Sequence, residues 1–113
     1  MLEDFLNWFD QTEAYFCFFE VKKEFTFDTE LNKNASVSLI LNNKDIFGKI
    51  ILSINGECEL FASWNGYTNE LYSSKKNIFN NKEDMEKVLL DFIKLINHAQ
   101  MLAWYCRDFE DNN

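Results

Sequence analysis

The chain has 113 residues, of which 47% are hydrophobic and 17% aromatic, and 19 acidic against 11 basic side chains give it a formal charge of -8. This length suits one domain over residues 1–113, and the many aromatic residues supply a core, which argues against intrinsic disorder. The acidic balance argues against direct binding of nucleic acid, because Lys and Arg must neutralise the phosphates. A basic protein is the better complement.

The cysteines and the N-terminus indicate the compartment. Cys17, Cys58 and Cys106 are an odd, widely spaced set without a CxxC pair, which is typical of reduced thiols. Glu3 and Asp4 stand where a secretory signal would carry positive charge, and no apolar run approaches the roughly 20 residues that span a bilayer. The sequence therefore predicts a cytoplasmic protein that contacts no membrane.

The first elements in chain order are a helix and a strand. Apolar residues at i, i+3, i+4 and i+7 predict a helix over roughly 2–13. Aromatic and β-branched residues over 15–27 then predict a strand, in which Cys17, Phe19 and Val21 face the core.

Three further strands follow with clearer alternation. Residues 35–41, 49–54 and 57–64 each place apolar side chains at every second position, which is the period of a strand with one buried face. The polar residues 42–45 form the first turn between them.

Parity decides the next two turns, because residues paired across an antiparallel ladder share a face. A three-residue loop over 54–56 pairs Leu52 with Cys58, whereas a two-residue loop would bring Glu59 into the core. Gly56 then occupies the left-handed position of such a bulged loop.

The following turn gives the opposite result. A two-residue loop over 65–66, of type I′, pairs Leu60 with Leu71 and keeps both inward. We therefore expect a fifth strand near 68–75.

A long helix closes the chain. Asn81 is a typical N-cap, and an apolar stripe from Met85 to Leu102 predicts a helix over 82 to about 105. Such a helix is longer than a five-stranded sheet needs for cover, so its last turns overhang. The acidic tail over 107–113 is expected to fray.

Together these elements predict an α+β fold of two layers. A five-stranded antiparallel meander carries the N-terminal helix and the long C-terminal helix on one face. The other face of the sheet is left open.

The chain shows little sign of catalytic chemistry. His98 is the only histidine and has no Cys or carboxylate at ligand spacing, so an ordinary helix position is the favoured interpretation. Cys58 and Cys17 alternate with core residues and are expected to be buried, while Cys106 lacks a nearby base. No nucleotide, zinc-protease or nucleophile motif occurs. We expect a protein that is not an enzyme and that has no cofactor and no metal.

The open face of the sheet is more informative. It is expected to carry one apolar residue from each strand and charged residues around them: Phe18, Ile40, Ile51, Phe61 and Tyr72, with Glu20, Lys49, Glu57, Glu59 and Glu70. An apolar centre with a charged rim is typical of a protein-binding surface. Singly exposed apolar residues on a solvated sheet, or a sheet covered by the overhanging helix, are the alternatives.

The order of segments resembles a known family. A short aromatic helix (LEDFLNWF), a strand ending in VKKE, then ASVSLILNN, GKIILSINGECELFA and a closing helix led by NKEDMEKVLLDFI are similar to TriTu-type immunity proteins of bacterial polymorphic-toxin and contact-dependent growth inhibition systems. The resemblance spans roughly residues 2–96. It implies a cytoplasmic antitoxin that binds one cognate toxin domain, commonly a nuclease, and blocks it without catalysis.

Strand parity alone then selects the partner-binding residues. Phe61 and Tyr72 are the expected anchors. The acids on the same face would mimic phosphate or pair with Lys and Arg of the toxin, and Ile51 completes the set: Ile51, Glu57, Glu59, Phe61, Glu70 and Tyr72. The resemblance implies that the partner is a basic, nuclease-like toxin domain, and the chain itself is expected to be a monomer or a weak dimer.

Two other functions remain open at this point. Secretion chaperones of type III systems are also small, acidic and cytoplasmic, but they usually place a helix between strands. An enzyme using Glu57, Glu59 or His98 is the third hypothesis, although exposed carboxylates on one strand face are far more often solvated surface.

Overall fold

The computed structural model describes residues 2–26, 35–66 and 70–111, without the side chains of 74–76 and 108–111. Its elements are, in chain order, α1 (Leu2–Gln11), η1 (Glu13–Phe16), β1 (Glu20–Thr26), β2 (Ser36–Asn42), β3 (Ile46–Ser53), β4 (Glu57–Trp64), β5 (Glu70–Ile78) and α2 (Lys82–Asp111). The fold is α+β, and the strands form one antiparallel meander in the order β1-β2-β3-β4-β5. The predicted fold class is confirmed.

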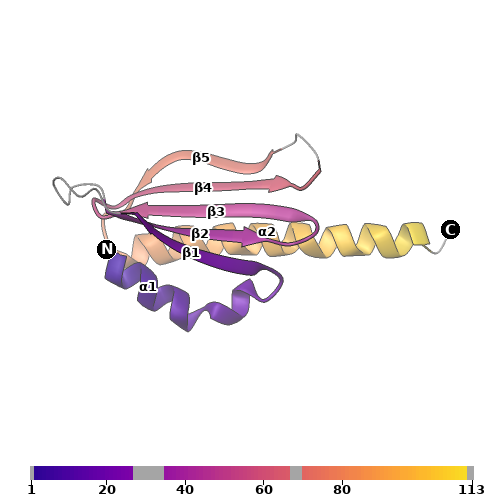
Figure 1. Ribbon diagram of the computed structural model, residues 1–113, viewed down its shortest axis with the longest axis horizontal. Coiled ribbons are helices and arrows are strands. Elements are labelled where there is room, and N and C mark those ends of the chain that lie inside the picture. The colour runs from indigo at the N-terminus through magenta and orange to yellow at the C-terminus, as the bar shows by residue number, and fades with distance from the viewer. Residues whose placement is uncertain (1, 27–34, 67–69, 112–113) are drawn as a thin grey trace.

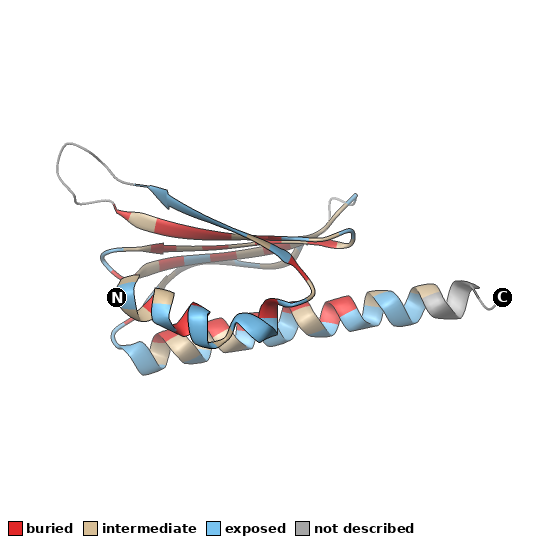
Figure 2. Ribbon diagram, turned by 60° about the horizontal axis from the view of Figure 1, so that its bottom comes forward, coloured by how far each residue is buried: buried red, intermediate tan, exposed pale blue. Residues whose placement is uncertain are grey.

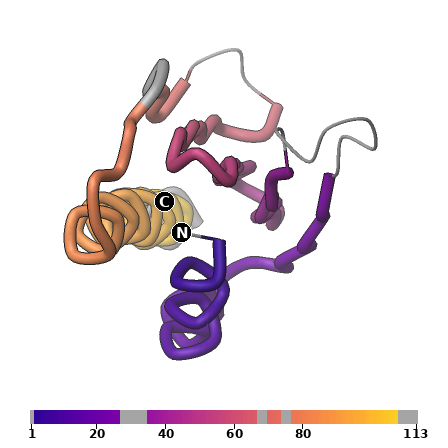
Figure 3. The backbone as a smooth tube through the Cα atoms, turned by 90° about the vertical axis from the view of Figure 1, so that its left-hand side faces the viewer, coloured from indigo at the N-terminus to yellow at the C-terminus, as the bar shows by residue number. Residues whose placement is uncertain are grey.

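Both helices cover the same face of the sheet, and α2 continues past its end (Figures 1 and 3). The buried core lies between these two layers. It consists of the alternate strand residues that face the helices together with the apolar stripes of α1 and α2: Phe5, Trp8, Phe9, Val37, Leu39, Leu41, Ile50, Leu52, Leu60, Met85, Leu89, Phe92, Ile93 and Ile96. The predicted inward residues of β2, β3 and β4 are thus confirmed, except that Ile54 lies exposed in the following turn.

The hairpin between β3 and β4 follows the predicted parity. Leu52 pairs with Cys58, and Gly56 has a φ of 87°. The carbonyl of Gly56 accepts a hydrogen bond from the N–H of Phe79 at 3.0 Å. A Cβ atom on Gly56 would stand 3.1 Å from the carbonyl oxygen of Phe79, so both backbone angle and space require glycine.

The predicted register between β4 and β5 is wrong. Leu60 pairs with Ser74 rather than with Leu71, because the ladder shifts between Ala62 and Ser63 and again between Cys58 and Leu60. Each bulge adds a residue to one strand and reverses its alternation. Gly66 does have the expected positive φ, but residues 67–69 lie outside the described chain, so the type of this turn is untested.

The first predicted strand begins too early. Residues 13–16 form the 3-10 helix η1, and β1 starts only at Glu20. Phe16 is drawn into the core, where its ring packs edge-on against Trp8 and Phe9 at centroid distances of 5.9 and 5.1 Å. This packing outweighs the β propensity of the aromatic run. Cys17, predicted to be buried, is exposed in the turn that follows.

The closing helix is also longer than predicted, because α2 extends to Asp111. Its N-terminus is as expected, since the side chain of Asn81 accepts the N–H of Asp84 at 2.8 Å. Near the other end, Arg107 donates to Asp45 of the β2–β3 turn at 2.7 Å. This contact ties the overhanging turns back to the sheet at Arg107, and the expected fraying of the acidic tail stays a prediction.

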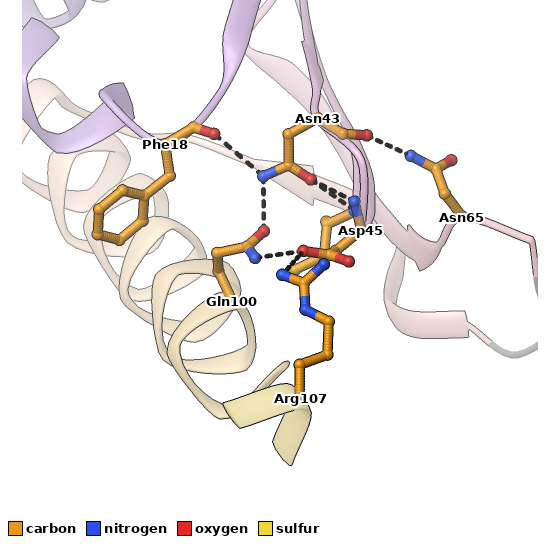
Figure 4. Close-up of polar contacts among 7 residues, drawn as sticks. Phe18, Asn43, Asp45, Asn65, Gln100 and Arg107 are labelled. Atoms are coloured by element: carbon orange, nitrogen blue, oxygen red, sulfur yellow. Dashed lines mark hydrogen bonds and ion pairs between the residues drawn. The ribbon is translucent and has the colours of Figure 1, made fainter. Parts of the chain in front are cut away.

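A polar cluster surrounds this ion pair (Figure 4). Gln100 is fully buried and bridges Asn43 and Asp45, donating to the Asp45 carboxylate at 2.7 Å. The side-chain oxygen of Asn43 accepts the N–H groups of Asp45 and Ile46, which shapes the turn. Its nitrogen donates to the carbonyl of Phe18 at 3.0 Å, so one asparagine connects the turn, α2 and the segment before β1.

Candidate functional site

The face of the sheet turned away from the helices is organised around one lysine. Lys49 lies on the central strand β3, with Ile40 and Phe61 directly opposite on the neighbouring strands. Phe47 and Ile51 stand two residues before and after it, on the same side of the strand. All five are half-buried, in contrast to the fully buried alternate residues of the same strands (Figure 2).

The two aromatic members of this group touch. The rings of Phe47 and Phe61 lie 6.3 Å apart between centroids, at 59°. Sequence reasoning missed Phe47, because the strand was expected to begin at residue 49. The sequence did contain a signal for the earlier start of the strand, because Ile46 and Gly48 extend the alternation of inward-facing residues in β3 toward its N-terminal end. We call Ile40, Phe47, Lys49, Ile51 and Phe61 the open-face cluster.

The charges around the cluster differ between its two sides. Glu57, Glu59 and Glu70 belong to β4 and β5, and Glu70 pairs with Ser63, which confirms its predicted place on the open face. Opposite Glu57 stands Ile78, a large apolar residue that is 62% exposed. Among the side chains that the structure describes, which leave out those of 74–76, this side of the open face carries three acids and an apolar end.

The β1 side is mixed in charge. Lys22 and Glu24 form an ion pair at 3.0 Å on this strand, and Glu20 stands two residues earlier on the same face. Opposite charges thus partly cancel at this edge.

Two residues predicted for the open face lie elsewhere. Tyr72 pairs with Ala62 on the helix-facing side, and its ring centroid is 5.6 Å from that of Phe92 on α2. The bulge between Ala62 and Ser63 causes this reversal. Phe18 precedes β1 and packs edge-on against Trp104 at 4.9 Å. Of the predicted contact residues, Ile51, Glu57, Glu59, Phe61 and Glu70 share the open face, and Tyr72 does not.

The reactive groups elsewhere are dispersed. Burial, helped by Glu59, raises the pKa of the Cys58 thiol to about 12, so this thiol stays protonated at neutral pH. His98 is exposed on α2. Within the described residues, no three His, Cys, Asp or Glu side chains come together as metal ligands. Among the described side chains, the open face offers an apolar centre with three glutamates beside it.

Comparison with known proteins adds no relative. No protein-family model matches the chain, and no curated protein matches its sequence. Among the described helices, none is both long enough and apolar enough to cross a bilayer.

Proposed function

We propose that the protein is an immunity protein of a bacterial polymorphic-toxin or contact-dependent growth inhibition system. It acts in the cytoplasm, binds a basic, nuclease-like toxin domain and inhibits it stoichiometrically, without catalysis. The open-face cluster is the anchor of the interface. The observation that carries this proposal is the contact between Phe47 and Phe61 on a sheet face that the helices leave uncovered.

Aromatic side chains in a centre that becomes dry on binding supply most of the energy of a typical interface. Phe61 and Phe47 keep part of their surface available for such contact, because they are half-buried. Glu57, Glu59 and Glu70 lie beside them, toward β5. Pairing these acids with Lys and Arg of a toxin fixes orientation, and the overall charge of -8 accelerates encounter.

The resemblance of the segment order to TriTu-type immunity proteins supports inhibition rather than another outcome of binding. The strands follow one another without an intervening helix, which fits this family better than secretion chaperones of type III systems. No observation favours the enzyme hypothesis, because Glu57 and Glu59 line a contact surface and His98 stands apart on α2.

The decisive experiment is a double substitution on the open face, Phe61→Arg with Glu59→Lys. We expect a toxin-like domain to be encoded beside this gene. The double variant should bind that domain about 100-fold or more weakly, because it removes an anchor and reverses a charge. Titration calorimetry measures the affinity, and circular dichroism checks the fold. The matched control is Tyr15→Arg with Glu83→Lys, which makes the same kinds of change on the helical side of the molecule.

The outcomes separate the hypotheses. Loss of binding and of toxin neutralisation in the open-face variant alone supports the proposal. Unchanged neutralisation by a folded variant would show that the partner binds elsewhere. A protein that binds its neighbour without reducing that neighbour's activity would be a chaperone.

A further inference from the structure

We propose that this protein forms a weak symmetric dimer by pairing its edge strand β1 with the β1 of a second copy. The open-face cluster is not involved, so this inference is independent of the proposed function. β1 is the first strand in the sheet order and pairs with β2 on one side. On its other side, the described residues provide no strand.

The sequence of β1 is self-complementary. We place a two-fold axis perpendicular to the sheet so that Lys23 of one copy lies opposite Lys23 of the other. The residue numbers of every facing pair then add up to 46. Lys22 then faces Glu24 of the second copy, and Glu24 faces Lys22. These two residues already attract each other within one strand, at 3.0 Å. Pairing therefore gives four charges in which every lysine has two glutamate neighbours.

Neighbouring registers lack this match. Axis positions halfway between two residues are excluded, because a two-fold perpendicular to the sheet must pair residues that share a face. A shift of the axis to Lys22 sets Lys22 opposite itself and Glu20 opposite Glu24. A shift to Glu24 sets Glu24 opposite itself and leaves Lys22 opposite Thr26. An axis at Val21 sets Glu20 opposite Lys22 but pairs only residues 20–22 of β1, whereas the axis at Lys23 brings opposite charges together and pairs the whole strand.

The helix-facing side of β1 is compatible with the same register. Val21, which is half-buried, faces Phe25 of the second copy, and Phe25 is 53% exposed. The axial lysines are directed away from each other, because each Lys23 ammonium lies 5.2 Å from the centroid of its own Phe9 ring. A hollow lined by Phe9, Phe16 and Val21 borders the strand here.

The expected dimer is weak and closed. The contact involves one short strand from each copy, which is small for a stable interface. Charged residues on an edge strand normally prevent open-ended sheet growth, and the two-fold satisfies both copies at once, so assembly stops at two. We expect dissociation constants between roughly 1 µM and 1 mM.

Sedimentation equilibrium of the full chain over that concentration range tests the dimer. Lys22→Glu alone or Glu24→Lys alone makes all four facing charges alike, and each is expected to weaken dimerisation by about tenfold or more. The swap Lys22→Glu with Glu24→Lys restores the pairs and returns the constant to within about threefold of the original. Glu3→Lys, an equal change of charge on exposed α1, is the control.

A crosslink tests the register independently. In a chain with Cys17→Ser and Cys106→Ser, Lys23→Cys places two thiols across the axis and is expected to form a dimer disulfide under mild oxidation, because directly opposed residues of antiparallel strands lie within disulfide range. Lys22→Cys faces Glu24 and is expected to form little. A wild-type chain that stays monomeric up to about 1 mM, or single charge variants that dimerise as well as the swap, would overturn the proposal.

Discussion

Ile50 and Ile51 are adjacent isoleucines on β3 whose side chains point to opposite faces of the sheet. Ile50 is fully buried between sheet and helices, whereas Ile51 stands half-buried in the open-face cluster. The inner face consists almost entirely of apolar residues that the helices cover, and the outer face mixes apolar and charged residues that nothing in the described chain covers. The core that stabilises the fold therefore lies on one side of the sheet, and the proposed contact surface lies on the other.

The largest expected effect is on stability, when each of these two isoleucines is replaced by alanine. Ile50→Ala should lower the free energy of unfolding by about 2–5 kcal/mol, because it leaves a cavity in a closed core. Ile51→Ala should cost about 1 kcal/mol or less, since water already reaches the site. Urea denaturation followed by circular dichroism measures both. Equal losses would mean that the outer face is also part of a core.

A second, smaller effect compares two cysteines. The raised pKa of Cys58 means that the folded chain holds the thiol proton more tightly than the unfolded chain does. The contribution of this thiol to the free energy of unfolding is fully present below about pH 9 and is lost as the pH rises toward about 12. The loss reaches about 2 kcal/mol by about pH 10.5.

Denaturation curves from about pH 8 to about pH 10.5 measure this loss. Cys58→Ala removes the titrating group, so the difference between the two pH profiles isolates its contribution. Cys17→Ala is the matched control, because that thiol is exposed. If the Cys58→Ala profile were as steep as that of the original chain, burial of the thiol would not be the cause.

The smallest expected effect concerns the overhang of α2. Arg107→Ala removes a partly exposed ion pair with Asp45, which should change global stability by about 1 kcal/mol or less. Hydrogen exchange of the amides after Gln100 should nevertheless accelerate, because this contact ties the last turns to the sheet. Lys94→Ala, at an exposed position of the same helix, should leave that exchange unchanged.

Much of the sheet was predictable, since alternation and turn parity are local rules. The pairing of Leu52 with Cys58 follows from keeping Glu59 out of the core, and Gly56 supplies the turn that this pairing requires. Of the expected contact residues, those on β3 and β4 and Glu70 occupy the face assigned to them.

The errors arise where tertiary contacts override local rules. A bulge leaves no mark in alternation, and it turns Tyr72 toward Phe92 and away from the open face. Phe16 resembles a strand residue but fits a gap beside Trp8 and Phe9. Gln100 and Arg107 hold the overhanging part of α2 against a turn more than fifty residues earlier, and no periodicity along the helix can indicate this contact.

Lys49 has a consequence for which proteins can dock. The Lys49 ammonium has isoleucine and phenylalanine neighbours, so its solvation depends on access to water. Covering it with an apolar surface costs desolvation free energy. A partner that binds the proposed interface must therefore place an oxygen acceptor, such as a carboxylate or a backbone carbonyl, opposite the Lys49 ammonium. A uniformly cationic surface lacks such an acceptor, even though the negative net charge of the molecule attracts it. Lys49 would therefore disfavour wrong partners of this kind.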